Sequence, residues 1–301
     1  MRTAFFSLSE VSPIEIAKRT WTEIREDDVF GRAAQLAYYF FLALFPFLIC
    51  VIASLSVFGR ADRGRALLIA LFTRIFPVTA YRLIDQTMID IIRSGGPLRM
   101  SFGILFSLWS ASMGMTAVMD ALNAAYKVKE TRPLIKQYAI AIGLTIGLTV
   151  LVVAALLIVV LGDQLIASFP LENISALAWK FMKWPFSLAV LLLALALTYH
   201  FAPDLKNRKW HWLSPGSLAG VFLLLIVGFG VRIYVHYSGN FASLYGSLGA
   251  VIVLLICFYL GGVAILSGGA LNGLLANLAR AKNADQNEFT WGSTTEAPRQ
   301  K

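Results

Sequence analysis

The chain has 301 residues, of which 58% are hydrophobic and only 14% are charged, and its mean hydropathy is +0.70. A soluble globular domain is much less apolar, so this composition excludes that class and predicts an integral membrane protein. Cys50 and Cys257 both lie in apolar stretches, unlike the cysteines of a disulfide scaffold or a zinc site. The net charge of +9 is spread along the chain without one basic and aromatic patch. We therefore expect anionic lipid headgroups as partners and no nucleic acid.

The first predicted element is an amphipathic helix over residues 12–26. Ser12, Pro13 and Glu15 fit an N-cap, a first-turn proline and a capping-box partner. One apolar stripe follows, formed by Ile14, Ala17, Trp21 and Ile24. Such a helix is expected to lie on the membrane surface. Residues 1–35 lack the pattern of a secretory signal peptide, so we expect them to be retained.

Six apolar segments are each long enough to cross a bilayer as a helix. They cover residues 36–58, 100–119, 138–161, 184–202, 213–231 and 244–271. The predicted fold is therefore an all-α polytopic membrane protein, a bundle of six transmembrane helices with additional amphipathic surface helices. A single membrane domain is expected over residues 1–280, followed by a polar, disordered tail over 281–301.

The segment between the first two spans is rich in arginine. The first span contains Pro46, which we expect to kink its helix. Residues 60–99 then contain seven arginines. We predict two amphipathic helices along the membrane interface, because a spanning helix would place too many charges in the bilayer. Arg74, Arg82 and Arg93 are candidate contacts for a lipid phosphate, the alternative being a solvated surface.

The last span is the most apolar part of the chain. No Lys, Arg, Asp or Glu occurs between Arg232 and Arg280. At 1.5 Å per residue, a helix over 244–272 is roughly 43 Å long, more than the hydrocarbon core of about 30 Å. This length predicts a long, tilted helix at the centre of the bundle.

Small residues recur four apart in two spans, which favours close helix packing. Gly268 belongs to such a series in the last span, and Ala139, Gly143 and Gly147 form one in the third. We expect these faces to contact other helices.

The distribution of basic residues predicts the orientation of the chain. The termini and the even-numbered loops carry 16 basic residues and the other three loops carry 10. Seven of those ten lie in the amphipathic segment, where the rule is weaker. Both termini are therefore expected in the cytoplasm.

A few polar residues near the spans are candidates for function. Asp120 is either a functional carboxylate or a residue that caps a helix end or pairs with Lys127. Asn123 and Asn272 could hydrogen-bond along a substrate path or between helices as ordinary packing contacts.

Two further candidates are basic. Arg232 and His236, one helical turn apart, could offer a lipid phosphate a cationic face, the alternative being an arginine that extends to the interface. Of the aromatic candidates, Tyr38, Tyr39 and Tyr126 are expected to pack or to lie at the interface.

Several dispersed blocks of sequence occur in one order along the chain. They cover 33–46 (AAQLAYYFFLALFP), 108–112 (LWSAS), 121–128 (ALNAAYKV) with Arg132, 201–203 (FAP), 214–216 (SPG) and 245–250 (YGSLGA). This order resembles the YihY/BrkB family of bacterial inner-membrane proteins, once mislabelled as ribonuclease BN, over about residues 20–280. The motif positions are Tyr38, Pro46, Pro203, Pro215, Gly216, Tyr245, Gly246 and Gly249.

The resemblance implies a six-helix inner-membrane protein linked to envelope integrity, for which lipid transport has been proposed. Two positions depart from the family pattern, with Ala43 where serine is usual and Ala270 where a glutamate is usual. Any role of that glutamate, such as proton coupling, is therefore not carried over to this chain.

Enzyme motifs are missing from the sequence. His200, His211 and His236 stand apart without metal-ligand spacing, and neither a GxSxG elbow nor a GxxxxGK phosphate loop occurs. We expect no catalytic activity, no cofactor and no metal. The predicted function is the handling or transport of a lipid or other amphipathic molecule, and the alternative is a structural or scaffolding role without transport.

Overall fold

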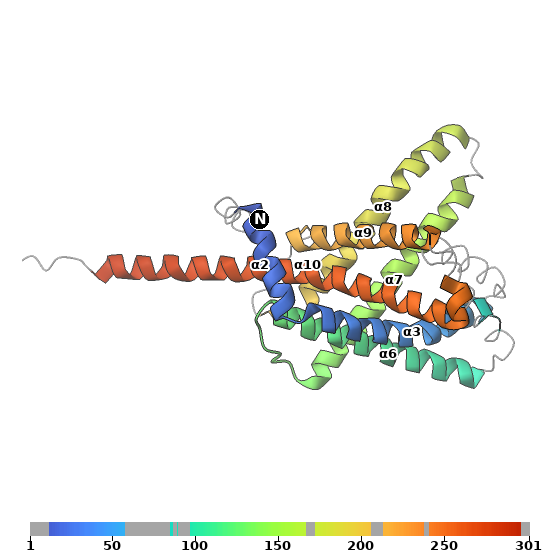
Figure 1. Cartoon of the computed structure of the whole chain (residues 1–301), viewed down its shortest axis with the longest axis horizontal. Helices are drawn as coiled ribbons and strands as arrows, with labels where there is room; N and C mark the ends of the chain where they lie inside the picture. The colour runs from blue at the N-terminus through green and yellow to red at the C-terminus, as the bar shows by residue number, and fades with distance from the viewer. Residues whose placement is uncertain are drawn as a thin grey trace, which may run out of the picture.

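A computed structural model describes residues 12–57, 85, 86, 89, 97–166, 172–205, 213–237 and 241–295. Over these residues the chain forms seven helices and no strand, so the all-α prediction is confirmed (Figure 1). The helices are α2 (Pro13–Glu26), α3 (Val29–Val57), α6 (Pro97–Ala125), α7 (Leu134–Ile166), α8 (Glu172–Phe201), α9 (Pro215–Tyr237) and α10 (Phe241–Thr295). Arg74, Arg82 and Arg93 lie outside the described residues.

Four helices are long and apolar enough to cross a membrane, counting only the described residues. The apolar lengths are Leu134–Val152, Phe181–Phe201, Pro215–Tyr234 and Val251–Ala281, and a shorter apolar stretch covers Val29–Leu44. The first two predicted spans fall in α3 and α6, which have 29 residues each. A helix of that length extends about 43 Å, comparable to a whole bilayer with its headgroups.

Helix α10 lies at the centre of the bundle, as its uncharged sequence predicts. It packs against α2, α3, α6 and α9, while α3 pairs with α6, and α7 packs against both α6 and α8 (Figure 1). The largest fully buried apolar side chains are Leu36, Met119, Leu122, Leu254 and Leu266. Helices α7, α8 and α9 are peripheral and expose many apolar side chains.

The helices α8, α9 and α10 meet at two glycines. A Cβ atom built on Gly216 of α9 would collide with the Gly268 carbonyl oxygen of α10, and one built on Gly268 would lie 2.6 Å from the Tyr199 hydroxyl oxygen. That hydroxyl donates a 2.6 Å hydrogen bond to the Ile265 carbonyl oxygen. The expected contact of Gly268 with other helices is therefore confirmed.

The corresponding prediction for the third span is wrong. A Cβ atom built on Gly143 or Gly147 would have no neighbour within 4 Å, and Ala139 is also exposed. Helix α7 buries a different side, on which Ala141 is fully covered. Spacing shows which small residues share a face, but it does not show whether that face meets protein or lipid.

Helix α2 forms where it is predicted, but its first turn is stabilised differently. The Ser12 side chain makes no capping hydrogen bond, and the Ser12 carbonyl oxygen accepts one from the Ile16 amide at 3.1 Å. Glu15 binds Arg19 at 2.9 Å instead of returning to the cap. The apolar stripe is also split, because Ile24 is buried whereas Ile14 and Trp21 are exposed.

Helix α10 continues to Thr295, whereas a disordered tail is predicted from residue 281. Alanine and lysine follow Arg280, and no proline occurs before Pro298. No proline therefore interrupts the helix before its end, and the helix, which already has a long core, continues through Gly292. The added turns project beyond the other helices (Figure 1).

A methyl group at Gly268 is expected to destabilise the protein. In Gly268→Ala the new Cβ lies 2.5 Å from the Gly216 carbonyl oxygen, so α9 must move away from α10. We expect a loss of about 1–3 kcal/mol, as in other overpacked cores, measured as a lower unfolding temperature in detergent. Gly147→Ala is the matched control, expected to be neutral or slightly stabilising. Equal unfolding temperatures for the two variants would contradict the close helix contact.

Candidate functional site around Arg132

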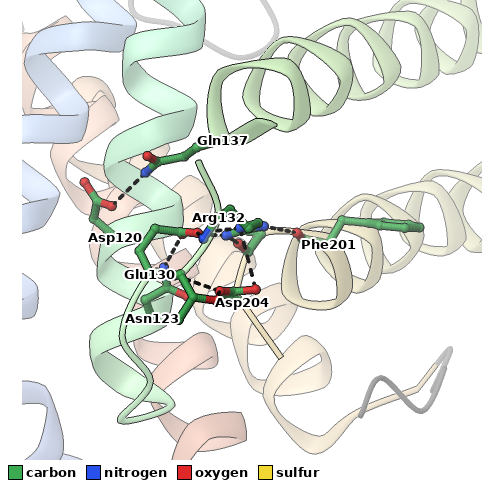
Figure 2. Close-up of polar contacts among 9 residues, drawn as sticks. Asp120, Asn123, Glu130, Arg132, Gln137, Phe201 and Asp204 are labelled. Atoms are coloured by element: carbon green, nitrogen blue, oxygen red, sulfur yellow. Dashed lines mark hydrogen bonds and ion pairs between the residues drawn. The ribbon is translucent and has the colours of Figure 1, made fainter. Parts of the chain in front are cut away.

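A polar cluster joins the end of α6, the loop that follows it and the end of α8 (Figure 2). The loop leaves α6 through Lys127, whose φ of 53° places a non-glycine residue in the left-handed region. This sharp turn brings the following residues back towards the bundle. Arg132 is at the centre of the cluster, and only 4% of its side chain is exposed.

Arg132 makes both ionic and capping contacts. Its Nε and Nη2 atoms each donate a 2.6 Å hydrogen bond to Glu130, a bidentate pair of the strong, charge-assisted kind. Nη2 also donates to the Ala202 carbonyl oxygen at 2.9 Å, and Nη1 to that of Phe201 at 3.5 Å. The last carbonyls of a helix lack intrahelical partners and carry its partial negative charge. Arg132 therefore caps the end of α8.

Asp204 and Asn123 complete the cluster. Asp204 accepts hydrogen bonds from the Thr131 amide at 2.9 Å and the Thr131 hydroxyl at 2.5 Å. The Asn123 side chain accepts one from the Asp204 amide at 2.7 Å and donates one to Glu130 at 2.8 Å. Both functions of the Asn123 amide group are thus used between α6, the loop and α8, close to the buried motif residue Pro203.

The charges in this cluster stabilise one another. The hydrogen bonds from Arg132 lower the pKa of Glu130 from its ordinary value of 4.5, against a smaller opposing effect of burial. The Arg132 pKa is raised, chiefly by Glu130. A lowered carboxyl pKa contributes stability that is fully present above the ordinary value and is lost as the pH falls through the folded value. Glu130 and Arg132 are therefore held as an ionised pair at neutral pH.

Asp120 connects α6 to α7 and does not pair with Lys127. Its Oδ1 atom accepts a long hydrogen bond of 3.4 Å from the side chain of Gln137 (Figure 2). Lys127 instead binds Glu23 at 2.7 Å and Asp27 at 2.9 Å, both at the end of α2. The predicted alternative of an Asp120–Lys127 pair is wrong, because the lysine is bound to the acidic residues of α2.

Asn272 lies at a second polar junction, between α10 and the start of α9. Its Oδ1 atom accepts a 2.8 Å hydrogen bond from the Gly216 amide, and its Nδ2 atom donates one of the same length to the Ser214 hydroxyl. Pro215 is the first residue of α9, a position at which an amide hydrogen would have no partner within the helix. The Asn272 side chain thus satisfies a free amide at the α9 N-terminus.

The other candidates are dispersed over the molecule. Arg232 is exposed on α9, in the helix that also contains His236, whose side chain lies outside the description. Tyr38 is 57% exposed and meets the edge of Tyr39 at a ring distance of 5.6 Å. Of the remaining motif residues, Pro46 lies within α3, Tyr245 and Gly246 lie near the start of α10, and Gly249 is buried there.

Glu130, Asp204 and Gln137 were not among the candidates inferred from the sequence. The sequence did contain a usable signal. Successive loops of an up-and-down bundle alternate between its two ends, so the loop after the second predicted span and the loop after the fourth lie at the same end. Glu130 and Arg132 flank Thr131 in one such loop, and Asp204 begins another. Opposite charges in two loops at one end of a bundle are positioned to pair.

Several segments far apart in the sequence meet at this one end of the bundle. The end of α2 is tied to the loop after α6 through Lys127, and that loop to the end of α8 through Arg132. Arg280 of α10 donates to the Tyr126 carbonyl oxygen at 3.4 Å. The N-terminal helix, two loops and the late part of α10 therefore lie at the same level.

Long apolar helices with polar, charge-paired ends define a multi-pass helical membrane protein. A family model described as virulence factor BrkB matches residues 20–290, and the chain belongs to the BrkB family. This confirms the resemblance inferred from the motifs.

Relatives support the same class. The chain is 34% identical over 265 residues to the ribonuclease-like protein YfkH of Bacillus subtilis, covering 86% of this chain and 94% of the relative. It is 27% identical over 267 residues to UPF0761 membrane proteins of Xanthomonas oryzae and Stenotrophomonas maltophilia, covering 87% of this chain. In these two cases the chain spans only 61% of the relative's length. No solved structure matches the chain.

Removing the Arg132 charge is expected to destabilise the bundle end. In Arg132→Gln, Glu130 and Asp204 lose their cation and the α8 carbonyls lose their cap. We expect a cost of about 3 kcal/mol, at the lower end of the range for broken buried pairs because both carboxylates keep some contact with water. Thermal unfolding in detergent measures the change.

Lys129→Gln is the matched control for this variant, since Lys129 is exposed in the same loop. It removes the same charge and is expected to leave the unfolding temperature unchanged. If the two variants unfolded alike, the Arg132 cluster would not be the structural joint that its contacts indicate.

Proposed function

We propose that this chain is a bacterial inner-membrane protein of envelope integrity or biogenesis, and that it handles or transports a lipid or another amphipathic molecule. The six spans of the proposal are α3, α6, α7, α8, α9 and α10. Membership of the BrkB family and the long apolar helices support the membrane assignment. The lipid assignment rests on the open apolar faces of two peripheral helices.

Those faces lie on α7 and α9. Gly143 and Gly147 of α7 have open space where a side chain would be, and so do Gly228 and Gly230 of α9. Exposed apolar side chains surround them, namely Ile142, Ile146 and Val150 on α7 and Leu225, Ile226 and Phe229 on α9. In a bilayer, a glycine-lined apolar face permits close approach of an acyl chain or of another helix. Two such faces on one protein favour contact with lipid chains as part of its function.

A structural or scaffolding role is the alternative. It predicts that the same glycine faces pack against the spans of a partner protein, with no movement of lipid. Neither role requires a catalytic step, a cofactor or a metal, and the ribonuclease-like name stays with the relative that carries it. The described residues contain no group of three or more His, Cys, Asp or Glu side chains that could hold a metal ion.

The proposed orientation places both termini in the cytoplasm. An even number of spans returns the chain to the side on which it starts, in keeping with the meeting of α2, two loops and Arg280 at one end. The excess of basic residues in the termini and even-numbered loops supports the cytoplasmic side for that end.

A test of orientation uses the last loop and the C-terminus. With Cys50 and Cys257 replaced, Asn240→Cys is expected to react with an impermeant thiol reagent added outside intact cells. A reporter fused after Lys301 is expected to show that the C-terminus lies in the cytoplasm. Reaction only in inverted membrane vesicles would reverse the proposed topology.

The lipid proposal is tested by reconstitution of the full chain into liposomes with a panel of labelled envelope lipids. We expect transbilayer movement of at least one lipid class to be severalfold faster than in empty vesicles. Filling the α7 face with Gly143→Leu and Gly147→Leu should slow this movement without unfolding the protein, because both sites are open.

Gly261→Leu on α10 is the matched control, since Gly261 also has open space. Its effect on lipid movement is expected to be small. A wild-type protein that moves no lipid, and whose α7 face crosslinks to a partner span, would support the scaffolding alternative instead.

A further inference from the structure

Helix α2 has two faces of different charge. On its inner face, the acidic residues Glu23 and Asp27 keep 21% and 9% of their side chains exposed and bind the Lys127 ammonium group at 2.7 and 2.9 Å. Ile24 is buried beside them. The contact with Lys127 raises the pKa of that lysine, chiefly through the hydrogen bond to Glu23. The Lys127 contact therefore offsets part of the acidic charge and holds this side of the helix against the bundle.

The outward side carries a single row of alternating apolar and basic residues. The row consists of Ile14, Lys18, Trp21 and Arg25, and all four are exposed. Spacings of four and three residues place them on one helical face. Lys18 and Arg25 form no ion pair with any described residue, so their charge is available to a partner. Trp21 meets Phe30, at the start of α3, edge to face with ring centroids 6.1 Å apart.

The position of α2 along the bundle corresponds to the edge of the apolar region. Lys127, which holds α2, follows Tyr126, whose carbonyl oxygen is bound by Arg280. Arg280 is the first charged residue after Arg232 along the chain. Helix α2 crosses the flank of α10, and α10 continues past it (Figure 1). The row thus lies at the level where the charges of the chain resume.

We propose that the outer row of α2 binds the surface of a membrane that contains anionic lipids. Ile14 and Trp21 would enter the boundary between headgroups and acyl chains, where tryptophan is favoured, and Lys18 and Arg25 would bind phosphate groups. The arrangement of charge supports this partner, because Glu23 and Asp27 are turned inwards to Lys127 while Lys18 and Arg25 are exposed on the outer row, and the exposed Glu26 lies outside that row. This inference does not depend on whether the protein moves lipid.

A label on the row can test this binding in the full-length protein. With Cys50 and Cys257 replaced, Ile14→Cys would carry an NBD fluorophore in nanodiscs made with or without phosphatidylglycerol. We expect the label to be blue-shifted and shielded from dithionite, more strongly in the anionic discs. Glu26→Cys is the matched control, since Glu26 is exposed on the same helix outside the row. Its label is expected to remain accessible in both lipids.

Charge variants then identify the contacts. Each basic residue near an anionic surface contributes enough to shift the ratio of shielded to accessible label about fivefold. Lys18→Gln and Arg25→Gln are each expected to cause such a shift in anionic discs. Arg19→Gln removes the same charge, but from a residue that is paired with Glu15, and should have a smaller effect. Unfolding temperatures in detergent control for folding.

Three results would overturn the proposal. Equal accessibility of the labels at residues 14 and 26 in both lipids would mean that the row faces water. Shielding that is independent of lipid charge, and that appears in detergent as the protein concentration rises, would assign the row to a second copy of the chain. Shielding only after a soluble protein is added would assign it to a protein partner.

Discussion

The close approach of α9 to α10 is the contact on which the arrangement of the outer helices depends. Gly216 and Gly268 bring the two backbones together, and the Tyr199 hydroxyl adds α8 through its bond to the Ile265 carbonyl oxygen. Side chains at either glycine would separate the helices. Because apolar burial gives little driving force between helices in lipid, close packing and interhelical hydrogen bonds have to supply it.

The polar junctions lie at the ends of helices, where backbone groups are free. Arg132 satisfies carbonyls at the end of α8, and Asn272 satisfies an amide at the start of α9. In a membrane, unsatisfied backbone groups are costly, so the side chains that cap them also determine where each helix ends. The Arg132 cluster and the Asn272 junction therefore join neighbouring helices as they complete their hydrogen bonding.

The helices could be predicted from the sequence because a helix that crosses a membrane requires a long apolar segment, and such segments can be recognised directly. The central place of α10 followed from its lack of charge, and the close contact of Gly268 from its small-residue series. The outward direction of Gly143 and Gly147 could not be predicted, since the same spacing serves helix packing and lipid contact. The partner of Lys127 was missed because Glu23 is 104 residues earlier in the chain, and only the folded bundle brings α2 to this loop.

The length of α10 has a consequence for whatever follows it. Thr295 lies 15 residues beyond Arg280, and as a continuous helix this stretch extends about 22 Å. The same rod that forms the centre of the bundle thus continues outwards as a spacer. Its end moves with the central helix as one body, so a tilt of α10 within the bundle would be converted into a larger sideways displacement at its tip.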